Sequence, residues 1–268
     1  NAEAKYLKEL RIPNPSITWE VANQANIGFD LYTLDSKLRF SADYFNNLRS
    51  DILCYRNASI PATAGLTLPR ENIGKVRNQG FELDLSYNNS AGDFTYYIGI
   101  NGGYAKSKIK FWDESPNVPD YQRATGKPIN TSLIGNNSAG LYYEAIGIFK
   151  DQEAIDNYPH WQGAKPGDVI FRDVNNDGKI DGLDRVRSDK TNIPTLTGGL
   201  NIELGYKDFY LTLGFQGAAG AARYHEVESG EAGNFSMEDL KGRWTPDNIN
   251  AKKPRVGNYR SEYWNQTE

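Results

Sequence analysis

Apolar and polar side chains alternate strictly, with a period of two residues, in several segments of this chain. The alternation runs without a slip through residues 38–44 (LRFSADY) and 81–87 (FELDLSY), where polar positions carry full charges. Further copies occur at 27–31, 200–204 and 209–216. A strand points successive side chains to opposite faces, so each segment has one apolar face and one hydrated face. The pattern predicts an all-β protein built of antiparallel strands.

The connections between these strands alternate between short and long. Tight polar turns at about residues 34–37, 89–93 and 206–208 join neighbouring strands. Membrane barrels keep short turns on the periplasmic side and long loops outside, whereas a sandwich has loops at both ends. The alternation therefore favours a transmembrane β-barrel, with hairpins expected at about residues 17–53, 74–109 and 195–220 and long loops at about 54–73, 110–194 and 221–268.

Aromatic side chains are frequent, and many lie near the expected hairpin ends. The chain has 17 Tyr and 11 Phe, and rings at such positions suit the aromatic girdles of a barrel at the membrane boundary. Cross-strand aromatic packing in a soluble sheet is the alternative interpretation. The residues in question are Tyr32, Tyr44, Phe45, Tyr87, Phe94, Tyr96, Tyr206, Phe209 and Tyr210.

Composition excludes several other classes of protein. Among 268 residues, 30 Lys and Arg stand against 34 Asp and Glu, a net charge of −4 that leaves no electrostatic footprint for nucleic acid or for an anionic membrane surface. The mean hydropathy of −0.65 and the lack of a long apolar run exclude a helical membrane span. No nucleophile and base are spaced as a catalytic pair would require, so we do not expect an enzyme.

Six strands are too few to close a barrel of this character. The alternation points charged residues inward, among them Arg39, Asp43, Glu82, Asp84 and Glu203, and a polar lumen needs more than the roughly eight strands of the smallest membrane barrels. An open sheet edge in lipid would leave N–H and C=O groups unpaired. We therefore expect the chain to be a section of a larger barrel.

One local motif matches a known metal-binding pattern closely enough to predict a metal site. Residues 173–184 (DVNNDGKIDGLD) match the calcium-loop pattern, with glycine at position 6 where the chain must turn. Lys179 would contribute its backbone carbonyl, and Asp184 stands where Glu is usual at position 12. The alternative is an Asx-rich surface turn that binds nothing. The expected ligands of a structural calcium ion are Asp173, Asn175, Asp177, Lys179, Asp181 and Asp184.

Taken in order, these segments resemble the barrel region of SusC/RagA-type TonB-dependent outer-membrane transporters. The most specific stretch is 166–173 (PGDVIFRD), which leads directly into the acidic loop. An Asp at position 12 of that loop is usual for the family. The other segments that carry the resemblance are residues 17–20 (ITWE), 24–30 (QANIGFD), 41–45 (SADYF), 50–53 (SDIL), 74–83 (GKVRNQGFEL), 184–185 (DR), 198–200 (GGL), 206–209 (YKDF), 216–217 (QG) and 243–246 (RWTP).

The resemblance implies more than the residues alone do. It implies a 22-stranded barrel in the outer membrane of a Bacteroidetes bacterium, with a plug domain and a TonB-contacting segment upstream of Asn1 and closing strands downstream of Glu268. Members of the family import glycans, or peptides in some branches, beneath a SusD-like surface lipoprotein. Energy reaches them from the inner membrane through TonB.

A soluble, calcium-stabilised β-sandwich that binds glycans is the alternative function from another class. It shares the alternating strands and the acidic loop. It differs in the expected disposition of loops and in having no lipid-facing surface.

Overall fold

The computed structural model describes residues 13–56, 69–131, 140–223 and 236–256. The chain divides into two compact units, one comprising Asn1–Ile129 with Lys190–Ala222 and the other Asn130–Asp189 with Arg223–Glu268. We call them the sheet unit and the loop unit. Parts of the expected loops at 54–73, 110–194 and 221–268 lie outside the described residues. No helix in the described ranges is both long enough and apolar enough to cross a bilayer.

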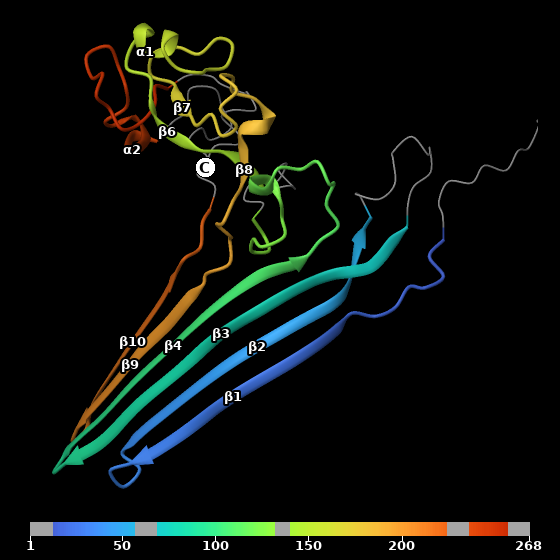
Figure 1. Cartoon of the computed structure of the whole chain (residues 1–268). Coiled ribbons are helices and arrows are strands. Elements are labelled where there is room, and N and C mark those ends of the chain that lie inside the picture. The colour runs from blue at the N-terminus through green and yellow to red at the C-terminus, as the bar shows by residue number, and fades with distance from the viewer. Residues whose placement is uncertain (1–12, 57–68, 132–139, 224–235, 257–268) are drawn as a thin grey trace, which may run out of the picture. The chain divides into compact units, whose positions relative to one another are not determined.

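The sheet unit contains one six-stranded antiparallel sheet with the strand order β1-β2-β3-β4-β9-β10. Figure 1 shows these strands side by side, from β1 in blue to β10 in orange. Each short turn joins two strands that are neighbours in the sheet. The strands are β1 (Val21–Thr33), β2 (Leu38–Tyr55), β3 (Arg70–Ala91), β4 (Phe94–Phe111), β9 (Leu196–Tyr206) and β10 (Phe209–Ala219).

The strand register carries the alternation of the sequence across all six strands. Row by row, apolar residues pair with apolar residues: Leu31 with Phe40, Phe40 with Leu85, and Leu85 with Ile100. The row continues through Leu200 to Phe215. A slip of one residue at any pair would send a whole strand's apolar set to the opposite face. The register therefore gives the sheet one apolar face and one polar face over its full width.

A β-bulge interrupts β2 near the end remote from the tight turns. Asp51 has a φ of 57°, and the pairing with β3 shifts between Arg49 and Ile52. The side chain of Asn72 spans the irregularity, since its Nδ2 donates to the Asp51 carbonyl at 2.8 Å and to the Thr18 carbonyl at 2.9 Å. An extra residue in one strand bends it and increases its twist.

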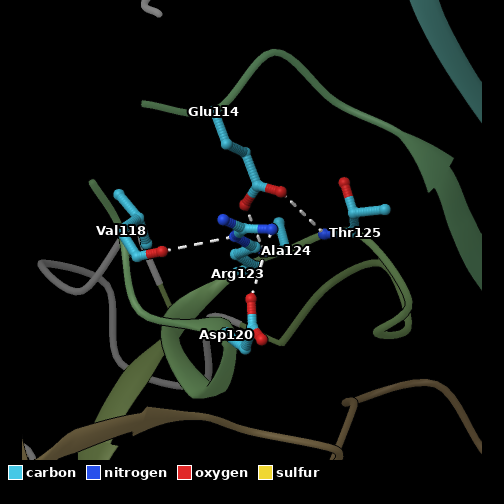
Figure 2. Close-up of polar contacts among 6 residues, drawn as sticks. All are labelled: Glu114, Val118, Asp120, Arg123, Ala124 and Thr125. Atoms are coloured by element: carbon cyan, nitrogen blue, oxygen red, sulfur yellow. Dashed lines mark hydrogen bonds and ion pairs between the residues drawn. The ribbon is translucent and has the colours of Figure 1, made fainter. Parts of the chain in front are cut away.

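The loop that follows β4 is anchored to the sheet by backbone and carboxylate contacts. Ile109 donates to the Lys127 carbonyl and Gly126 to the Ile109 carbonyl, each at 2.8 Å. Figure 2 shows the Glu114 carboxylate accepting from the backbone N–H groups of Ala124 and Thr125, the second at 3.2 Å. Arg123 at the end of the 3₁₀ helix η2 (Asp120–Gln122) pairs with Asp120 at 3.2 Å.

The loop unit has regular structure where a long irregular loop was expected. Its strands form two small antiparallel sheets, β5 with β8 and β6 with β7. The Asp151 side chain caps helix α1 by accepting from Ala154 N at 2.8 Å, which satisfies one of the free amides of its first turn. The elements are β5 (Leu141–Tyr143), β6 (Ala145–Ile148), α1 (Gln152–Asp156), β7 (Val169–Phe171), the 3₁₀ helix η3 (Gly182–Asp184), β8 (Arg185–Arg187) and α2 (Met237–Leu240).

A buried aromatic cluster forms the core of the loop unit. Tyr143 and Phe149 are 0% exposed, and Trp161 packs on Phe171 with ring centroids 5.1 Å apart. Ile155 of α1 and Ile180 of the acidic loop complete the cluster. Large rings bury more apolar area than most other side chains, so this cluster stabilises a unit whose strands are short.

A buried ion pair joins two distant parts of the loop unit. Arg255 Nε lies 2.6 Å from Asp168 Oδ1, and the Asp168 side chain is 1% exposed. Gly167 beside it has a φ of 90°, and a Cβ there would meet the Trp244 ring at 2.5 Å. The turn at residues 166–168 (PGD) thus packs against the Trp244 ring through Gly167 and binds Arg255 through Asp168.

Candidate functional site

The apolar face of the sheet carries two rows of aromatic rings separated by a band of mainly aliphatic side chains. Phe94, Tyr206 and Phe209 are paired near the tight turns and form the turn-end row. Tyr44, Phe81 and Tyr104 are paired further along and form the loop-end row, in which the Phe81 and Tyr104 rings stack with centroids 5.6 Å apart. Between the rows lie Leu85, Ile98, Ile100, Leu200, Ile202, Leu211, Leu213 and Phe215.

The spacing of the two rows matches the apolar thickness of a barrel in a membrane. In β4 they are ten residues apart (104 − 94). At ~3.3 Å per residue and a strand tilt of roughly 35–45°, this is a height of about 25 Å, the apolar band of outer-membrane barrels. The side chains of this band are largely exposed in the chain itself, with Leu211 at 50% and Phe209 at 78%. The apolar face therefore has the dimensions and chemistry of a lipid-facing surface.

The register divides the aromatic residues singled out in the sequence between the two faces. Tyr44, Tyr87, Phe94, Tyr96, Tyr206 and Phe209 lie on the apolar face, as a girdle requires. Tyr32, Phe45 and Tyr210 lie one residue out of phase, on the polar face, so the girdle prediction was wrong for these three. Phe45 lies over Gly80, where a Cβ would come within 2.8 Å of the ring.

Carboxylates dominate the centre of the polar face. Asp43 and Glu82 are directly opposite each other, and Asp84 is opposite Ser41 on one side and Asn101 on the other. These residues and Thr197 line a shallow hollow in the sheet surface. Nearby, Arg39 lies 3.9 Å from Asp30 and 5.5 Å above the Tyr32 ring. The polar face therefore presents hydrogen-bonding and charged groups to the water or ligand that contacts it.

The acidic loop predicted to bind calcium lies in the loop unit, between β7 and β8. Asp173 Oδ2 accepts from Gly178 N at 2.8 Å and its Oδ1 from Asp177 N at 3.2 Å. Asn175 Nδ2 donates to Asp177 Oδ2 at 2.9 Å. Gly178 has a φ of 81°, as expected at the sixth position of a calcium loop. The first three predicted ligands are thus linked to one another within a single turn.

The remaining predicted ligands close the loop. Asp184 is 0% exposed, and its two oxygens accept from Val174 N at 2.9 Å and Asp181 N at 2.8 Å. Asp181 in turn caps η3 by accepting from Leu183 N at 2.7 Å. The Asp177 carboxylate also accepts from Lys179 N at 2.9 Å. Within the described residues, no three Asp, Glu, His or Cys side chains converge as a metal centre. The calcium site stays a prediction.

A family comparison decides between the two interpretations of the sheet. The model of the family described as TonB dependent receptor-like, beta-barrel, matches residues 6–261. The chain belongs to this family. Its members are transporters and receptors rather than enzymes, in agreement with the sequence prediction. The membership also sets aside the soluble sandwich that the sequence left open.

Individual relatives of this barrel are longer proteins. TonB-dependent receptor P3 of Formosa agariphila is 29% identical over 251 residues, which cover 90% of this chain and 25% of the relative. TonB-dependent receptor P26 of the same organism is 28% identical over 259 residues, covering 92% and 25%. The chain thus spans about a quarter of the length of the curated relatives it matches.

Solved structures share the fold of the receptor barrel. A chain of the RagAB peptide importer in the open-open state matches with a TM-score of 0.67 and 20% identity, over 97% of this chain and 28% of that one. A chain of the RagAB peptide transporter matches with a TM-score of 0.61. The likeness to RagA-type barrels confirms the expected fold class, while the 22-strand count stays a prediction.

Proposed function

We propose that this chain forms part of the wall of a bacterial outer-membrane barrel that imports nutrient oligomers in a TonB-dependent manner. The observation that carries the proposal is the register of the six strands, which builds an apolar band of about 25 Å between two aromatic rows. Membership of the TonB-dependent receptor family supports the direction of transport. In this proposal the strands cross the membrane several times.

The local role of the chain is to line a water-filled pathway for the cargo. The polar face carries Ser41, Asp84, Asn101 and Thr197 around a hollow, and they supply hydroxyl, amide and carboxylate groups. Such groups exchange hydrogen bonds with water and with a passing polar oligomer at little net cost. No step of covalent chemistry is required of these residues.

The proposed cargo is a glycan or peptide oligomer, delivered with the help of a SusD-like surface lipoprotein. The solved neighbours are described as a peptide importer and a peptide transporter, which supports a peptide cargo. The resemblance to SusC supports a glycan cargo. TonB would act through the part of the protein that precedes this sequence.

Membrane fractionation and uptake test this proposal together. The full-length protein is expected in the outer-membrane fraction, and a strain lacking it is expected to lose uptake of one class of labelled oligomer, peptide or glycan. A strain that carries the protein but lacks TonB serves as the control and should lose the same uptake. Recovery of the full-length protein in aqueous extract without detergent would overturn the proposal.

We also propose that residues 173–184 hold a structural calcium ion. The donor set suits a hard cation, because Asp173, Asn175, Asp177, Asp181 and Asp184 offer side-chain oxygens and Lys179 a backbone carbonyl. A carboxylate has about four lone-pair sites, so the backbone N–H bonds it accepts leave room for a metal bond. The ion would neutralise aspartates that otherwise repel one another and would hold Ile180 in the core of the loop unit.

Limited proteolysis of the full-length protein tests the calcium proposal. Calcium is expected to slow cleavage within residues 173–184, and Asp177→Ala is expected to abolish that protection. Lys179→Ala is the matched control in the same loop, because the proposal uses only its backbone carbonyl, and it should keep the calcium effect. If chelation leaves the cleavage rate of the unaltered protein unchanged, the loop is not a metal site.

A further inference from the structure

The net charge of the chain conceals a local concentration of cations on the apolar side of the sheet. Just beyond the loop-end aromatic row, Arg77 of β3 and Lys106 and Lys108 of β4 share the face of Phe81 and Tyr104. We call these three residues the cationic patch. Lys75 and Lys110 continue the run at the register shift that ends the regular pairing. The net charge of −4 over the whole chain predicted no contact with an anionic membrane surface. The strand register nevertheless brings these cations together, and they are a candidate site for such a contact.

The register places like charges directly opposite each other in this patch. Arg77 pairs with Lys108, and Lys106 pairs with Gln79 one row nearer the aromatic rings. Directly opposed side chains have Cβ atoms ~5 Å apart, and like charges there are destabilising. A surface that keeps such a pair is stabilised when an anion lies between the two cations.

The strands on the β3 side of the patch supply no such anion. The neighbours on the same face are Asn46 opposite Gln79 and Leu48 opposite Arg77, both uncharged. Continuing the two rows to β1 adds Ala25 and Asn23. On the other side, Gly126 of the loop after β4 lies beside Lys108, and the Glu114 carboxylate of that loop accepts from the backbone N–H groups of Ala124 and Thr125. Among the residues that the structure describes, no carboxylate forms an ion pair with Arg77, Lys106 or Lys108.

The position of the patch relative to the apolar band identifies the anion. Lys106 and Lys108 lie two and four residues beyond Tyr104 (106 − 104 and 108 − 104), which is about 5 Å and 10 Å above the aromatic row for a tilted strand. The polar headgroup layer of a bilayer is ~5–8 Å thick on each side. Long basic side chains extend their charged ends into that layer.

The patch lies at the end of the sheet that carries the long connections. In a membrane barrel that end is extracellular. At the opposite end, the tight turns mix both signs, with Asp35, Asp93, Lys207 and Asp208. At the loop end, Glu20 and Glu71 are paired with Arg49 and Arg56, whereas the cationic patch lies on the apolar face with no carboxylate of the described residues in ion-pair contact.

We propose that Arg77, Lys106 and Lys108 bind the phosphate groups of anionic lipids in the outer leaflet. This inference rests on the proposed function, because it needs the apolar band to face lipid. The contact would fix the height of the barrel in the membrane and offset the repulsion between the opposed cations. The patch is expected to select lipids whose phosphate headgroup has a net negative charge. A zwitterionic lipid also has a phosphate, but its headgroup has no net charge.

Native mass spectrometry of the full-length protein in neutral detergent tests the inference. The protein is incubated with equal parts of phosphatidylglycerol and phosphatidylcholine, and the retained lipids are identified. Preferential retention of phosphatidylglycerol is expected, with a loss on raising the salt concentration. Arg77→Gln, Lys106→Gln and Lys108→Gln together should weaken that retention by about fivefold per cation, on the order of a hundredfold.

A second triple variant controls for charge alone. Lys150→Gln, Lys241→Gln and Lys252→Gln remove three exposed cations outside the sheet and should leave the lipid preference unchanged. Arg77→Lys keeps the charge and should keep the preference, and heat-dependent electrophoretic migration reports that each variant barrel is folded. Equal phosphatidylglycerol retention by the unaltered protein and the patch variant would overturn the inference.

Other outcomes separate this inference from its alternatives. If an acidic protein co-purifies with the unaltered protein, and the patch variant loses that protein but retains its lipids unchanged, the lipid assignment is overturned in favour of a protein partner. A full-length protein that fractionates with the outer membrane and imports oligomers but shows no lipid preference would refute the patch alone. A protein absent from the outer membrane would instead refute the proposed function.

Discussion

The sheet unit and the loop unit place the same kinds of side chain in opposite environments. In the loop unit, Phe149 and Tyr143 are 0% exposed and pack in a closed aromatic core. In the sheet unit, Phe29 and Phe215 are each 58% exposed, although they belong to continuous apolar rows. Among the described hydrophobic residues of the sheet unit, only Cys54 and Ala124 are buried, at 2% and 9% exposed.

The difference shows where each unit obtains its stability. The loop unit buries apolar surface against itself, as a water-soluble domain does. The sheet unit has a single layer, so its apolar face must be covered by something outside the chain. Hydrocarbon satisfies this requirement, because the ladders pair the backbone groups of neighbouring strands with one another.

The sharpest test of this difference is a cavity in the loop unit. Phe149→Ala removes a fully buried ring and is expected to destabilise that unit by about 3–5 kcal/mol. Faster cleavage of residues 140–189 by protease, with the strands of the sheet still protected, would confirm that the loop unit has its own core. Leu183→Ala, at a side chain that is 48% exposed, is the control and should cost no more than about 0.5 kcal/mol.

A charge on the apolar face tests the other side of the comparison. Leu85 pairs with Ile100, which lies four residues from Tyr104 and six from Phe94 (104 − 100 and 100 − 94), near the middle of the apolar band. Leu85→Arg is expected to cost about 2–4 kcal/mol of folding free energy for the full-length protein in lipid vesicles, measured by urea titration.

Two matched variants on the same strand make that test specific. Leu83→Arg lies two residues nearer the loop-end aromatic row and should cost less, since the penalty falls with distance from the midplane. Asp84→Asn, on the polar face, should cost no more than about 0.5 kcal/mol. Similar costs for Leu85→Arg and Asp84→Asn would contradict the assignment of the two faces.

The ion pairs of the two units are expected to differ in strength for the same reason. Arg255 and Asp168 are 19% and 1% exposed, whereas Arg39 and Asp30 of the sheet are 50% and 56% exposed. Arg255→Gln should destabilise the loop unit by about 2 kcal/mol, below the 3–5 of a fully buried pair because Arg255 keeps some solvent contact. Arg39→Gln should cost no more than about 1 kcal/mol.

Hydrogen exchange of the amide of Gly167, which donates to the Phe149 carbonyl at 2.6 Å, reports on the buried pair. Its protection should fall in Arg255→Gln. It should recover in part when Asp168→Asn is added, since the buried charge is then removed. Unchanged exchange in the single variant would show that Asp168 does not depend on Arg255.

Several features of the fold follow from local sequence alone. The alternation at 38–44 and 81–87 predicts strands because two-residue periodicity has one structural meaning. The turn at 34–37 was also predictable, and Leu34, Asp35 and Ser36 adopt the positive φ values of a tight hairpin. The order of the motifs predicted the family, which the family comparison confirmed.

Other features had no local signal. Strands of three or four residues such as β5 and β7 are too short to show periodicity, and they are held by contacts between residues far apart in the chain. Asp168 and Arg255 are 87 positions apart, so nothing in either segment indicates the other. The alternation of lysines at 106, 108 and 110 was visible in the sequence, but their proximity to Arg77 depends on how β3 and β4 pair.

The period, the turns and the chemistry of each strand's two faces follow from local sequence, because they depend on residues adjacent in the chain. Which faces of neighbouring strands coincide depends on how the strands pair in the folded protein. A shift of one residue exchanges the two faces of a strand, and that register separates Tyr32, Phe45 and Tyr210 from the girdle. The same register brings Arg77 beside Lys108, since cross-strand neighbours are chosen by pairing and not by position along the chain.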